Sequence, residues 1–319
     1  MKEFQLIEQY FQGRGPLRKD VVLGIGDDCA LLKPAERKFL AIACDTLVEN
    51  THFFPDMPAQ ALGYKALVVN LSDLAAMGAE PAWMTLALTL PEVDEAWVRD
   101  FSEGFFEAAD YYGIALVGGD TTCGPKSITV TVQGLVPEGA ALTRHGAKNG
   151  DWIYVTGTLG DSALGLDILR GTVDVRPEYR QALIARHYHP TPRVLAGQSL
   201  RKLASSAIDV SDGLLSDIRH VLKASGCGAM IEVSDLPLSQ GLKDCVSEEQ
   251  ARQYALCGGE DYELLFTVPE SQKGALQTAL NQAGVRFTCI GQISAGTQLK
   301  LKLHGEPYEA TFTGFEHFK

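Results

Sequence analysis

The chain has 319 residues, of which 45% are hydrophobic and 21% are charged, a composition typical of a globular protein whose length allows two domains of about 100–200 residues. The formal net charge of −12 argues against a nucleic-acid-binding protein, which depends on a basic face. No apolar run approaches the roughly 20 residues needed to cross a bilayer, and the N-terminal stretch has no signal-peptide core, so we expect no membrane partner.

Along the first half of the chain, the hydrophobic pattern alternates between helical and strand periods. The predicted elements are an amphipathic helix over 1–10, a strand over 39–44, a helix over 59–77, a strand over 84–90, a helix over 94–112, and strands over 114–117 and 128–136. The last of these strands alternates apolar and polar residues, which predicts that one of its faces is exposed.

A polar, turn-rich stretch at 146–151 ends this first block, and we place the domain boundary there, with domains at 1–148 and 149–319. The second domain is predicted to contain strands over 152–156, 229–233, 264–268, 287–293 and 298–303, helices over 161–169, 178–187, 192–205 and 248–254, and further helices ending near 224 and following 268. These elements predict a two-domain α/β fold with mixed sheets. Seven cysteines without CxxC pairing indicate reduced thiols, which are typical of a cytoplasmic protein.

The most informative feature is a set of aspartates placed where apolar runs break into short turns rich in Gly, Ser and Thr. They lie in GIGDD at 24–28, AIACDT at 41–46, GGDTT at 118–122 and IDVSDG at 208–213. Carboxylates without basic neighbours repel one another unless a cation lies between them, and Mg²⁺ prefers such oxygen ligands. A Mg²⁺ cluster beside Gly-rich turns indicates a polyphosphate, so the pattern predicts ATP-dependent phosphoryl transfer. An ordinary turn at Asp27 and Asp28 is the alternative at the first of these places.

Asp45 and Asp120 are each predicted to end an apolar strand, and α/β sheets bind ligands at the carboxyl ends of their strands. A helix-cap role is the alternative for both. Asp73 lies inside a predicted helix on a face that we expect to be largely buried. Because a buried carboxylate with no Lys or Arg within a turn is costly, a metal is the better partner for Asp73.

Other polar side chains are weighed against structural roles. Ser211 precedes a predicted helix, whose free N–H groups suit a phosphate, although an ordinary helix cap gives the same pattern. The Arg144 guanidinium is suited to binding a phosphate through two hydrogen bonds, although an arginine in such a place is more often an ordinary surface residue. His52 and Glu260 are candidates for substrate contact, whereas for His187 and His189 we expect structural roles.

Taken together, five motifs resemble those of the thiamine-monophosphate kinase family, over essentially the whole chain. They are GIGDDCA at 24–30, NLSDLAAMG at 70–78, GGDT at 118–121, DVSDGL at 209–214 and GGEDYE at 258–263. The Gly-Gly-Asp and Ser-Asp-Gly elements alone also resemble the wider aminoimidazole-ribonucleotide-synthetase superfamily. The ordered set of all five motifs makes the resemblance specific.

The resemblance implies an N-terminal α/β domain that dimerises through its sheet and a C-terminal α/β domain that covers an ATP site. It implies a homodimer that uses several Mg²⁺ ions to transfer the γ-phosphoryl group of ATP to thiamine monophosphate. The implied metal residues are Asp28, Asp45, Asp73, Asp120, Asp209 and Asp212, to which we add Cys44 through its backbone. The implied substrate contacts are Gly119, Asp120, Arg144 and Ser211 for ATP, and His52, Glu260 and Phe315 for the thiamine substrate.

The implied reaction agrees with the chemistry of these residues. The acceptor is a phosphate oxygen that is already anionic at neutral pH, so no catalytic base is expected, and Mg²⁺ with Arg144 neutralises charge. Two departures from the family pattern are visible. Ala43 and Cys44 stand where hydroxyl residues commonly precede Asp45, and Phe315 replaces a C-terminal Trp or Tyr. Neither departure removes a carboxylate.

Two other functions stay open from the sequence. Another enzyme of the superfamily, such as aminoimidazole ribonucleotide synthetase, would bind a ribose phosphate and release orthophosphate. A nucleotide- or thiamine-phosphate-binding protein would bind without turnover, although binding alone does not call for so many carboxylates.

Overall fold

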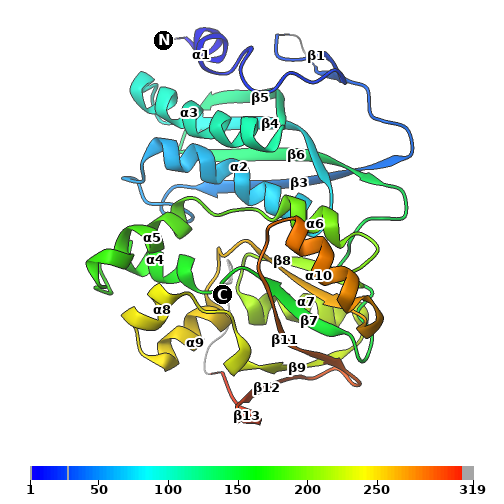
Figure 1. Cartoon of the computed structure of the whole chain (residues 1–319). Helices are drawn as coiled ribbons and strands as arrows, with labels where there is room; N and C mark the ends of the chain where they lie inside the picture. Colours follow the sequence, from blue (N-terminus) through cyan, green and yellow to red (C-terminus); the bar gives the residue numbers. More distant parts are fainter. Residues whose placement is uncertain (1, 27–28, 311–319) are drawn as a thin grey trace. The chain divides into compact units, whose positions relative to one another are not determined.

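The structure is a computed structural model that describes residues 2–26 and 29–310 (Figure 1). It divides into two compact units, an N-terminal unit of Met1–Leu74 with Ala79–Gly139 and a C-terminal unit of Ala75–Gly78 with Ala140–Lys319. Each unit combines helices with a mixed sheet, which confirms the predicted two-part α/β fold. The domain boundary at residue 148 stays a prediction.

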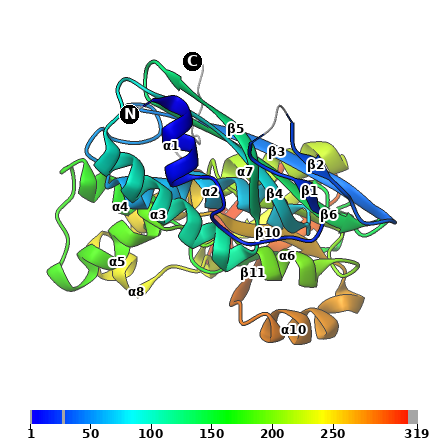
Figure 2. The same cartoon turned by 90° about the horizontal axis from the view of Figure 1, so that it is seen from above.

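The N-terminal unit is built on a four-stranded sheet of β3 (Lys38–Val48), β4 (Glu80–Leu90), β5 (Ala115–Cys123) and β6 (Ser127–Pro137). The strand order is β3-β6-β4-β5, with antiparallel pairs except for the parallel β4–β5 pair. Helices α2 (Ala59–Ala76) and α3 (Glu95–Tyr112) lie side by side on one face of this sheet (Figures 1 and 2). The apolar residues of β6 are buried, whereas its alternate residues are half-buried and less exposed than predicted.

The two helices approach each other closely because glycines lie at their contact. A Cβ atom on Gly63 of α2 would lie 2.0 Å from the backbone oxygen of Phe101, and one on Gly104 of α3 would lie 1.8 Å from that of Gln60. Helix α3 begins where the Asp94 carboxylate accepts two backbone N–H groups, and it ends at Gly113 with a left-handed φ of 67°.

The N-terminal segment contributes α1 (Glu3–Tyr10) and the short pair β1 (Val21–Leu23) and β2 (Leu31–Leu32). Apolar residues of β1 and β2 pack against a small cluster that includes the buried Trp83 of β4. The indole N–H of Trp83 donates to the Asp20 carboxylate at 3.1 Å, and Arg18 pairs with the same carboxylate at 2.8 Å. These contacts fix the start of the segment that leads to the Gly-rich stretch at 24–26.

The C-terminal unit contains a seven-stranded sheet in the order β13-β12-β9-β11-β7-β10-β8. The strands are β7 (Trp152–Thr156), β8 (Ser206–Val210), β9 (Gly228–Glu232), β10 (Glu263–Val268), β11 (Phe287–Ser294), β12 (Leu299–Leu303) and β13 (Glu306–Tyr308). Only β9 and β12 pair in parallel among these described strands. The sheet is therefore mixed, as predicted.

Helices of the C-terminal unit form two apolar cores. They are α4 (Asp161–Leu169), α5 (Pro177–Tyr188), α6 (Val194–Leu200), α7 (Leu214–Ser225), α8 (Gln240–Cys245), α9 (Glu248–Cys257) and α10 (Lys273–Gln282), with one-turn helices at Val233–Asp235 and Glu270–Gln272. One core lies between the sheet and α7 and α9. A second core joins α4, α5, α8 and α9.

Two predicted strands prove longer than expected. Strand β3 continues to Val48 and β5 continues to Cys123, so Asp45 and Asp120 lie inside strands and not at their ends. The Thr-rich sequences that the prediction assigned to turns are favourable in strands, because a β-branched side chain fits a pleated surface. The predicted helix over 192–205 is shorter, as α6 spans Val194–Leu200, and α8, β1, β2, β8 and β13 were not predicted.

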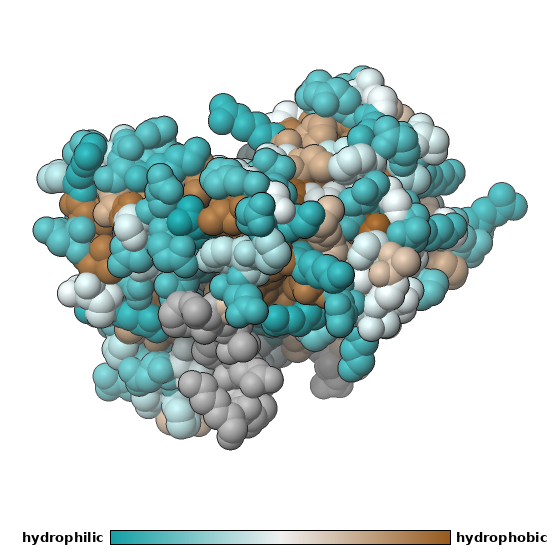
Figure 3. Space-filling model, turned by 90° about the horizontal axis from the view of Figure 1, so that it is seen from below, coloured by the Kyte–Doolittle hydropathy of each residue, from teal (hydrophilic) through white to brown (hydrophobic). Residues whose placement is uncertain are grey.

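Hydrophilic side chains cover most of the face seen in Figure 3, and hydrophobic ones appear there in small groups. None of the helices in the described part of the chain has the length and apolar character that crossing a membrane requires.

Candidate active site

In the N-terminal unit, the structure brings Asp45 of β3 close to the helix that carries Asp73. The backbone N–H of Asp45 donates to Oδ1 of Asn70 at 2.9 Å, and the Asn70 amide donates to the Ala66 backbone oxygen at 3.0 Å. Asn70 is buried, and Asp73 lies three residues further along the same face of α2, half-buried. The buried amide therefore fixes the strand beside this face of the helix.

Asp120 lies at the opposite edge of the same sheet. Asp45 of β3 pairs with Val130 of β6, Val130 pairs with Leu86 of β4, and Leu86 pairs with Gly119 of β5. The edge strands β3 and β5 are therefore three strand spacings of about 4.8 Å, or about 14 Å, apart. Asp120 belongs to the adjacent row, which points to the other face of the sheet. No single ion contacts both carboxylates within one copy of the chain. Among the described residues, no group of three or more His, Cys, Asp or Glu side chains could hold a metal ion.

Gly119 and His52 have clear local roles. A Cβ atom on Gly119 would lie 1.9 Å from the backbone oxygen of Leu86, so only glycine fits this part of β5. Nδ1 of His52 accepts the backbone N–H of Val48 at 3.0 Å, which places the proton of a neutral ring on Nε2. Cys44 is exposed, and its sulfur accepts a hydrogen bond from the Thr131 hydroxyl at 3.3 Å.

In the C-terminal unit, a carboxylate cluster forms where β8 turns into α7. Asp209 is buried at the end of β8, Asp212 follows in the turn, and Asp217 is 2% exposed in the first turn of α7. Oδ2 of Asp217 accepts the backbone N–H groups of Ser211 and Asp212, both at 3.1 Å. Burial, together with the negative charges of Asp209 and Asp212, raises the pKa of Asp217 to about 7.

Two carboxylates of this turn, Asp209 and Asp212, offer oxygens of the kind that Mg²⁺ prefers, and an ion bound to these two would take its remaining ligands from water or substrate. The mutual repulsion that raises the Asp217 pKa is what a bound cation relieves. The backbone N–H of Ser211 donates to Asp217, so a phosphate at Ser211 relies on the Ser211 hydroxyl and not on that N–H.

The GGEDYE segment is docked on this turn. The Glu260 N–H donates to the Ser211 backbone oxygen at 2.7 Å, and the Tyr262 N–H donates to that of Val210 at 2.9 Å. A Cβ atom on Gly259 would lie 2.6 Å from the Ser211 oxygen, which explains the glycine. Glu260 and Tyr262 both have left-handed backbones, with φ of 65° and 50°, a costly conformation that surrounding contacts must hold in place. Two predicted site residues, Ser211 and Glu260, are thus brought together.

The Glu260 side chain is also held. Nδ1 of the buried His187 lies 3.3 Å from Oε2 of Glu260 and 3.2 Å from the Ser162 hydroxyl. Both contacts use the same ring nitrogen, whereas a catalytic triad uses the two nitrogens of the histidine for its two partners. The arrangement orients the Glu260 carboxylate and provides no activated nucleophile.

The two other acids of this segment are buried within the fold. Glu263 accepts hydrogen bonds from Arg186 at 3.0 Å and Thr156 at 2.6 Å, and two from Arg193. Asp261 accepts the Gly160 N–H at 2.8 Å, and burial raises its pKa well above the ordinary value. These contacts anchor the segment and leave Glu260 as its candidate for ligand contact.

Arg144 is exposed and lies away from Ser211. The Thr143 backbone oxygen accepts the N–H of Ala207 near the start of β8, whereas Ser211 follows the end of that strand, about 13 Å further along. Two predicted site residues, Asp28 and Phe315, lie outside the described residues.

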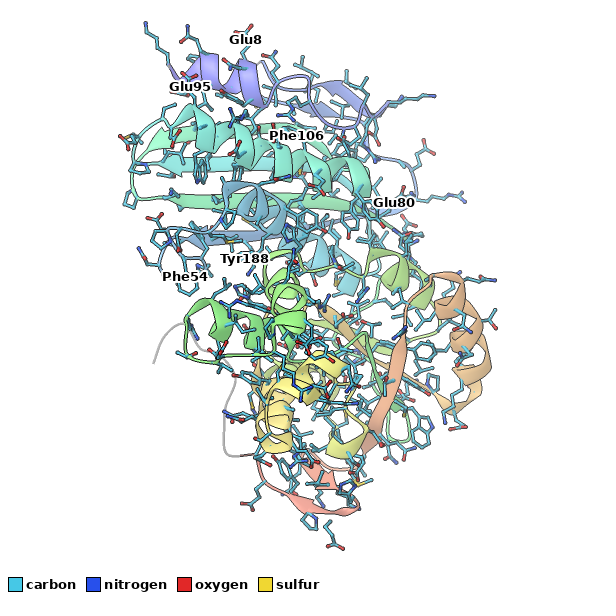
Figure 4. All side chains as sticks on the ribbon, turned by 60° about the vertical axis from the view of Figure 1, so that its left-hand side comes forward. Glu8, Phe54, Glu80, Glu95, Phe106 and Tyr188 are labelled. Carbon is cyan, nitrogen blue, oxygen red and sulfur yellow. The ribbon has the colours of Figure 1, made fainter. Side chains whose placement is uncertain are left out.

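Two residues near the site, Asn70 and Asp217, were given no role by the sequence analysis. Asn70 stood within a quoted motif and Asp217 within a predicted helix, but their partners are backbone N–H groups that only the folded chain brings near. His187 was expected to be structural, and its buried position agrees, although it contacts Glu260. A separate hollow is lined by Gln5, Glu8, Gln9 and Glu95 and includes none of the predicted site residues. Figure 4 labels two of these side chains, Glu8 and Glu95.

Comparison with known families gives two matching family models, one in each half of the chain. Residues 26–136 match the family "AIR synthase related protein, N-terminal domain", and residues 148–304 match "AIR synthase related protein, C-terminal domain". The chain is 57% identical over 318 residues to the thiamine-monophosphate kinase of Escherichia coli (strain K12), which covers 99% of this chain and 98% of the relative.

Two solved structures are similar over nearly their whole length. The crystal structure of thiamine-monophosphate kinase from Stenotrophomonas maltophilia K279a has a TM-score of 0.85 and 44% identity, and covers 91% of this chain and 93% of its own. The structure of AaThiL complexed with AMPPCP and TMP has a TM-score of 0.79 and 34% identity, and covers 92% of each chain.

Proposed function

The chain belongs to the thiamine-monophosphate kinase family, and from that premise we propose that it transfers the γ-phosphoryl group of ATP directly to thiamine monophosphate, producing thiamine diphosphate and ADP. The similarity to such kinases over 318 residues, at 57% identity, carries this proposal. The similar AaThiL structure holds AMPPCP and TMP in one complex. AMPPCP is ATP with a methylene group in place of the β–γ bridging oxygen, so that pair corresponds to the donor and acceptor of the reaction.

The reaction needs positioning and charge neutralisation more than proton transfer. The acceptor oxygen of thiamine monophosphate is already largely anionic at neutral pH, because the second pKa of such a phosphate is about 6. No side chain therefore has to act as a general base. Two polyanions must instead be brought together in line, and their repulsion must be offset.

We assign this neutralisation to several Mg²⁺ ions. The proposed ligands are Asp28, Asp45, Asp73, Asp120, Asp209 and Asp212, with Cys44 contributing its backbone oxygen. Bound Mg²⁺ would neutralise the charge that develops on the transferred phosphoryl group. Because about 14 Å separates the edges that carry Asp45 and Asp120, these two residues serve different ions within one copy of the chain.

The substrate contacts follow the same proposal. Gly119, Asp120, Arg144 and Ser211 contact ATP, and His52, Glu260 and Phe315 contact thiamine monophosphate. Glu260 suits this role because its carboxylate is 28% exposed, held by His187, and opposite in charge to the thiazolium ring. Its backbone bond to Ser211 ties the acceptor contact to the turn proposed to hold ATP and metal.

We also propose a cytoplasmic homodimer. Strand β3 lies at an edge of the described four-stranded sheet, runs for 11 residues and exposes three large apolar side chains. These are Phe39, Leu40 and Ile42, which are 55%, 45% and 62% exposed. A long apolar edge strand is an aggregation hazard unless something covers it, and a second copy of the chain is the occupant that we propose.

A chromatographic assay of the purified protein with ATP, MgCl₂ and thiamine monophosphate tests the reaction. We expect thiamine diphosphate and ADP in equal amounts, and no product when EDTA replaces MgCl₂. Release of orthophosphate without thiamine diphosphate would instead favour carbonyl activation, the chemistry of an aminoimidazole ribonucleotide synthetase. ATP-induced stabilisation without any product would favour a binding protein.

A further inference from the structure

Asp217 is a buried carboxylate that the proposed reaction does not use. Its side chain comes from the first turn of α7, yet it does not cap that helix, whose N-cap residue is Gly213 and which has no side-chain cap. Instead, Oδ2 reaches back to accept the N–H groups of Ser211 and Asp212, both at 3.1 Å. Two N–H bonds occupy the lone pairs of that oxygen, so Oδ2 is not available to a metal ion.

The charges around Asp217 are of one sign. Asp209 and Asp212 lie close enough to disfavour its ionised form. Within the described residues, no Lys, Arg or His side chain forms an ion pair or a hydrogen bond with Asp217. If residue 217 only had to hold the turn, a neutral Asn or Ser would do so at a lower free-energy cost, because a neutral acceptor is not repelled by Asp209 and Asp212.

We propose that Asp217 is a positioning residue for the turn at 209–213: it fixes the Ser211 and Asp212 peptides and adds a third negative charge that strengthens divalent-cation binding by Asp209 and Asp212, without contacting the ion through Oδ2. This inference rests on the proposed function, since that function assigns Mg²⁺ to Asp209 and Asp212. The two contributions of Asp217, hydrogen bonding and charge, can be separated by substitution.

Asp217→Asn keeps an acceptor oxygen for both N–H groups and removes the charge, whereas Asp217→Ala removes both. For Asp217→Asn, we expect the MgCl₂ concentration that gives half-maximal activity to rise about threefold to tenfold, while kcat at saturating MgCl₂ stays within about threefold. For Asp217→Ala, we expect kcat at saturating MgCl₂ to fall at least about tenfold, because the turn loses its anchor. Asp151→Asn is the matched control: Asp151 is also buried and accepts a backbone N–H, from Lys148 at 2.9 Å, and we expect no change in the MgCl₂ requirement.

Thermal unfolding supplies a readout that does not depend on activity. Each protein is unfolded once in EDTA and once in MgCl₂. In MgCl₂, we expect the wild type to gain more in unfolding temperature than the variant does. The Asp151→Asn control is expected to gain as much as the wild type.

Three results would overturn the inference. An unchanged MgCl₂ requirement and unchanged Mg²⁺-induced stabilisation in Asp217→Asn would remove the role of the charge. A fall in kcat of Asp217→Asn as large as that of Asp217→Ala would make Asp217 a direct metal ligand. Wild-type kcat in Asp217→Ala would remove the role of the hydrogen bonds. Failure of the proposed function would appear differently, as absence of thiamine diphosphate from the wild-type assay, and the thermal experiment would still report on the charge.

Discussion

At the scale of single residues, the GGEDYE motif shows how one short sequence divides its acids between structure and ligand contact. Glu263 is 0% exposed and bonded to two arginines, whereas Glu260 is 28% exposed on a left-handed backbone. The sequence placed both acids in one motif but could not separate them, because burial and arginine partners come from helices far away in the chain. The same holds for Asp217, whose N–H partners exist only once the turn is folded.

Substitution of Glu260 tests the contact with the thiamine substrate. Glu260→Gln removes the charge that faces the cationic ring, so we expect the KM for thiamine monophosphate to rise about tenfold, with the KM for ATP unchanged. Steady-state kinetics with each substrate varied in turn measures both constants. Glu248→Gln, at a 92% exposed position on α9, is the control and should leave both constants unchanged. An unaltered KM for thiamine monophosphate in Glu260→Gln would remove Glu260 from the substrate site.

Substitution of Glu263 tests the structural half of the motif. Glu263→Gln leaves Arg186 and Arg193 facing a neutral amide in a buried place, so we expect the free energy of unfolding to fall by about 3 kcal/mol. Urea unfolding followed by circular dichroism measures the change, again with Glu248→Gln as the control. A loss below about 0.5 kcal/mol would mean that the arginines find other partners.

At the scale of helices and strands, the sequence was most informative where local signals agree with the fold. Helix α3 begins at the Asp94 cap and ends at Gly113 as its pattern predicts, and α4 occupies the predicted 161–169. Strand ends were less predictable, because the Thr-rich continuations of β3 and β5 become strands only through pairing with neighbouring strands. That pairing moves Asp45 and Asp120 into strand interiors at opposite edges of one sheet.

Close packing of α2 and α3 gives a prediction at this scale. In Gly104→Ala, the added Cβ would lie 1.8 Å from the Gln60 backbone oxygen, so the helices must move apart, and we expect a loss of about 3 kcal/mol in the free energy of unfolding. Gly274→Ala on α10 is the matched control, since nothing lies within 4 Å of its added Cβ. In Gly274→Ala, we expect the free energy of unfolding to rise by about 0.5 kcal/mol, because alanine has a higher helix propensity than glycine. Equal effects at both sites in urea unfolding would contradict the close contact between α2 and α3.

At the scale of the whole molecule, the two α/β units and their mixed sheets were predictable from periodicity, and the reaction was predictable from the ordered motifs. The grouping of the carboxylates was not, because it depends on strand order and on register. Strand order is set by pairings between segments distant in sequence, such as β3 with β6, which no local pattern encodes.

The proposed homodimer is tested at the exposed edge strand β3. Ile42 is 62% exposed in the single chain, so Ile42→Asp should leave the fold intact and disrupt association. We expect light scattering to give the wild type about twice the mass of one chain, and the variant a mass near that of one chain at the same concentration. Glu306→Asp, on the short strand β13 of the other sheet, is the control and should leave the mass unchanged. A wild type with the mass of a single chain would contradict the proposed dimer.

The central claim, direct transfer of the γ-phosphoryl group to thiamine monophosphate, is tested most directly by following that group itself. ATP labelled in its γ-phosphate is incubated with the protein, MgCl₂ and thiamine monophosphate, and the labelled products are separated by chromatography. The account predicts that the label appears in the terminal phosphate of thiamine diphosphate, in equal amount to the ADP formed. Label found in orthophosphate, with thiamine monophosphate recovered unchanged, would contradict it.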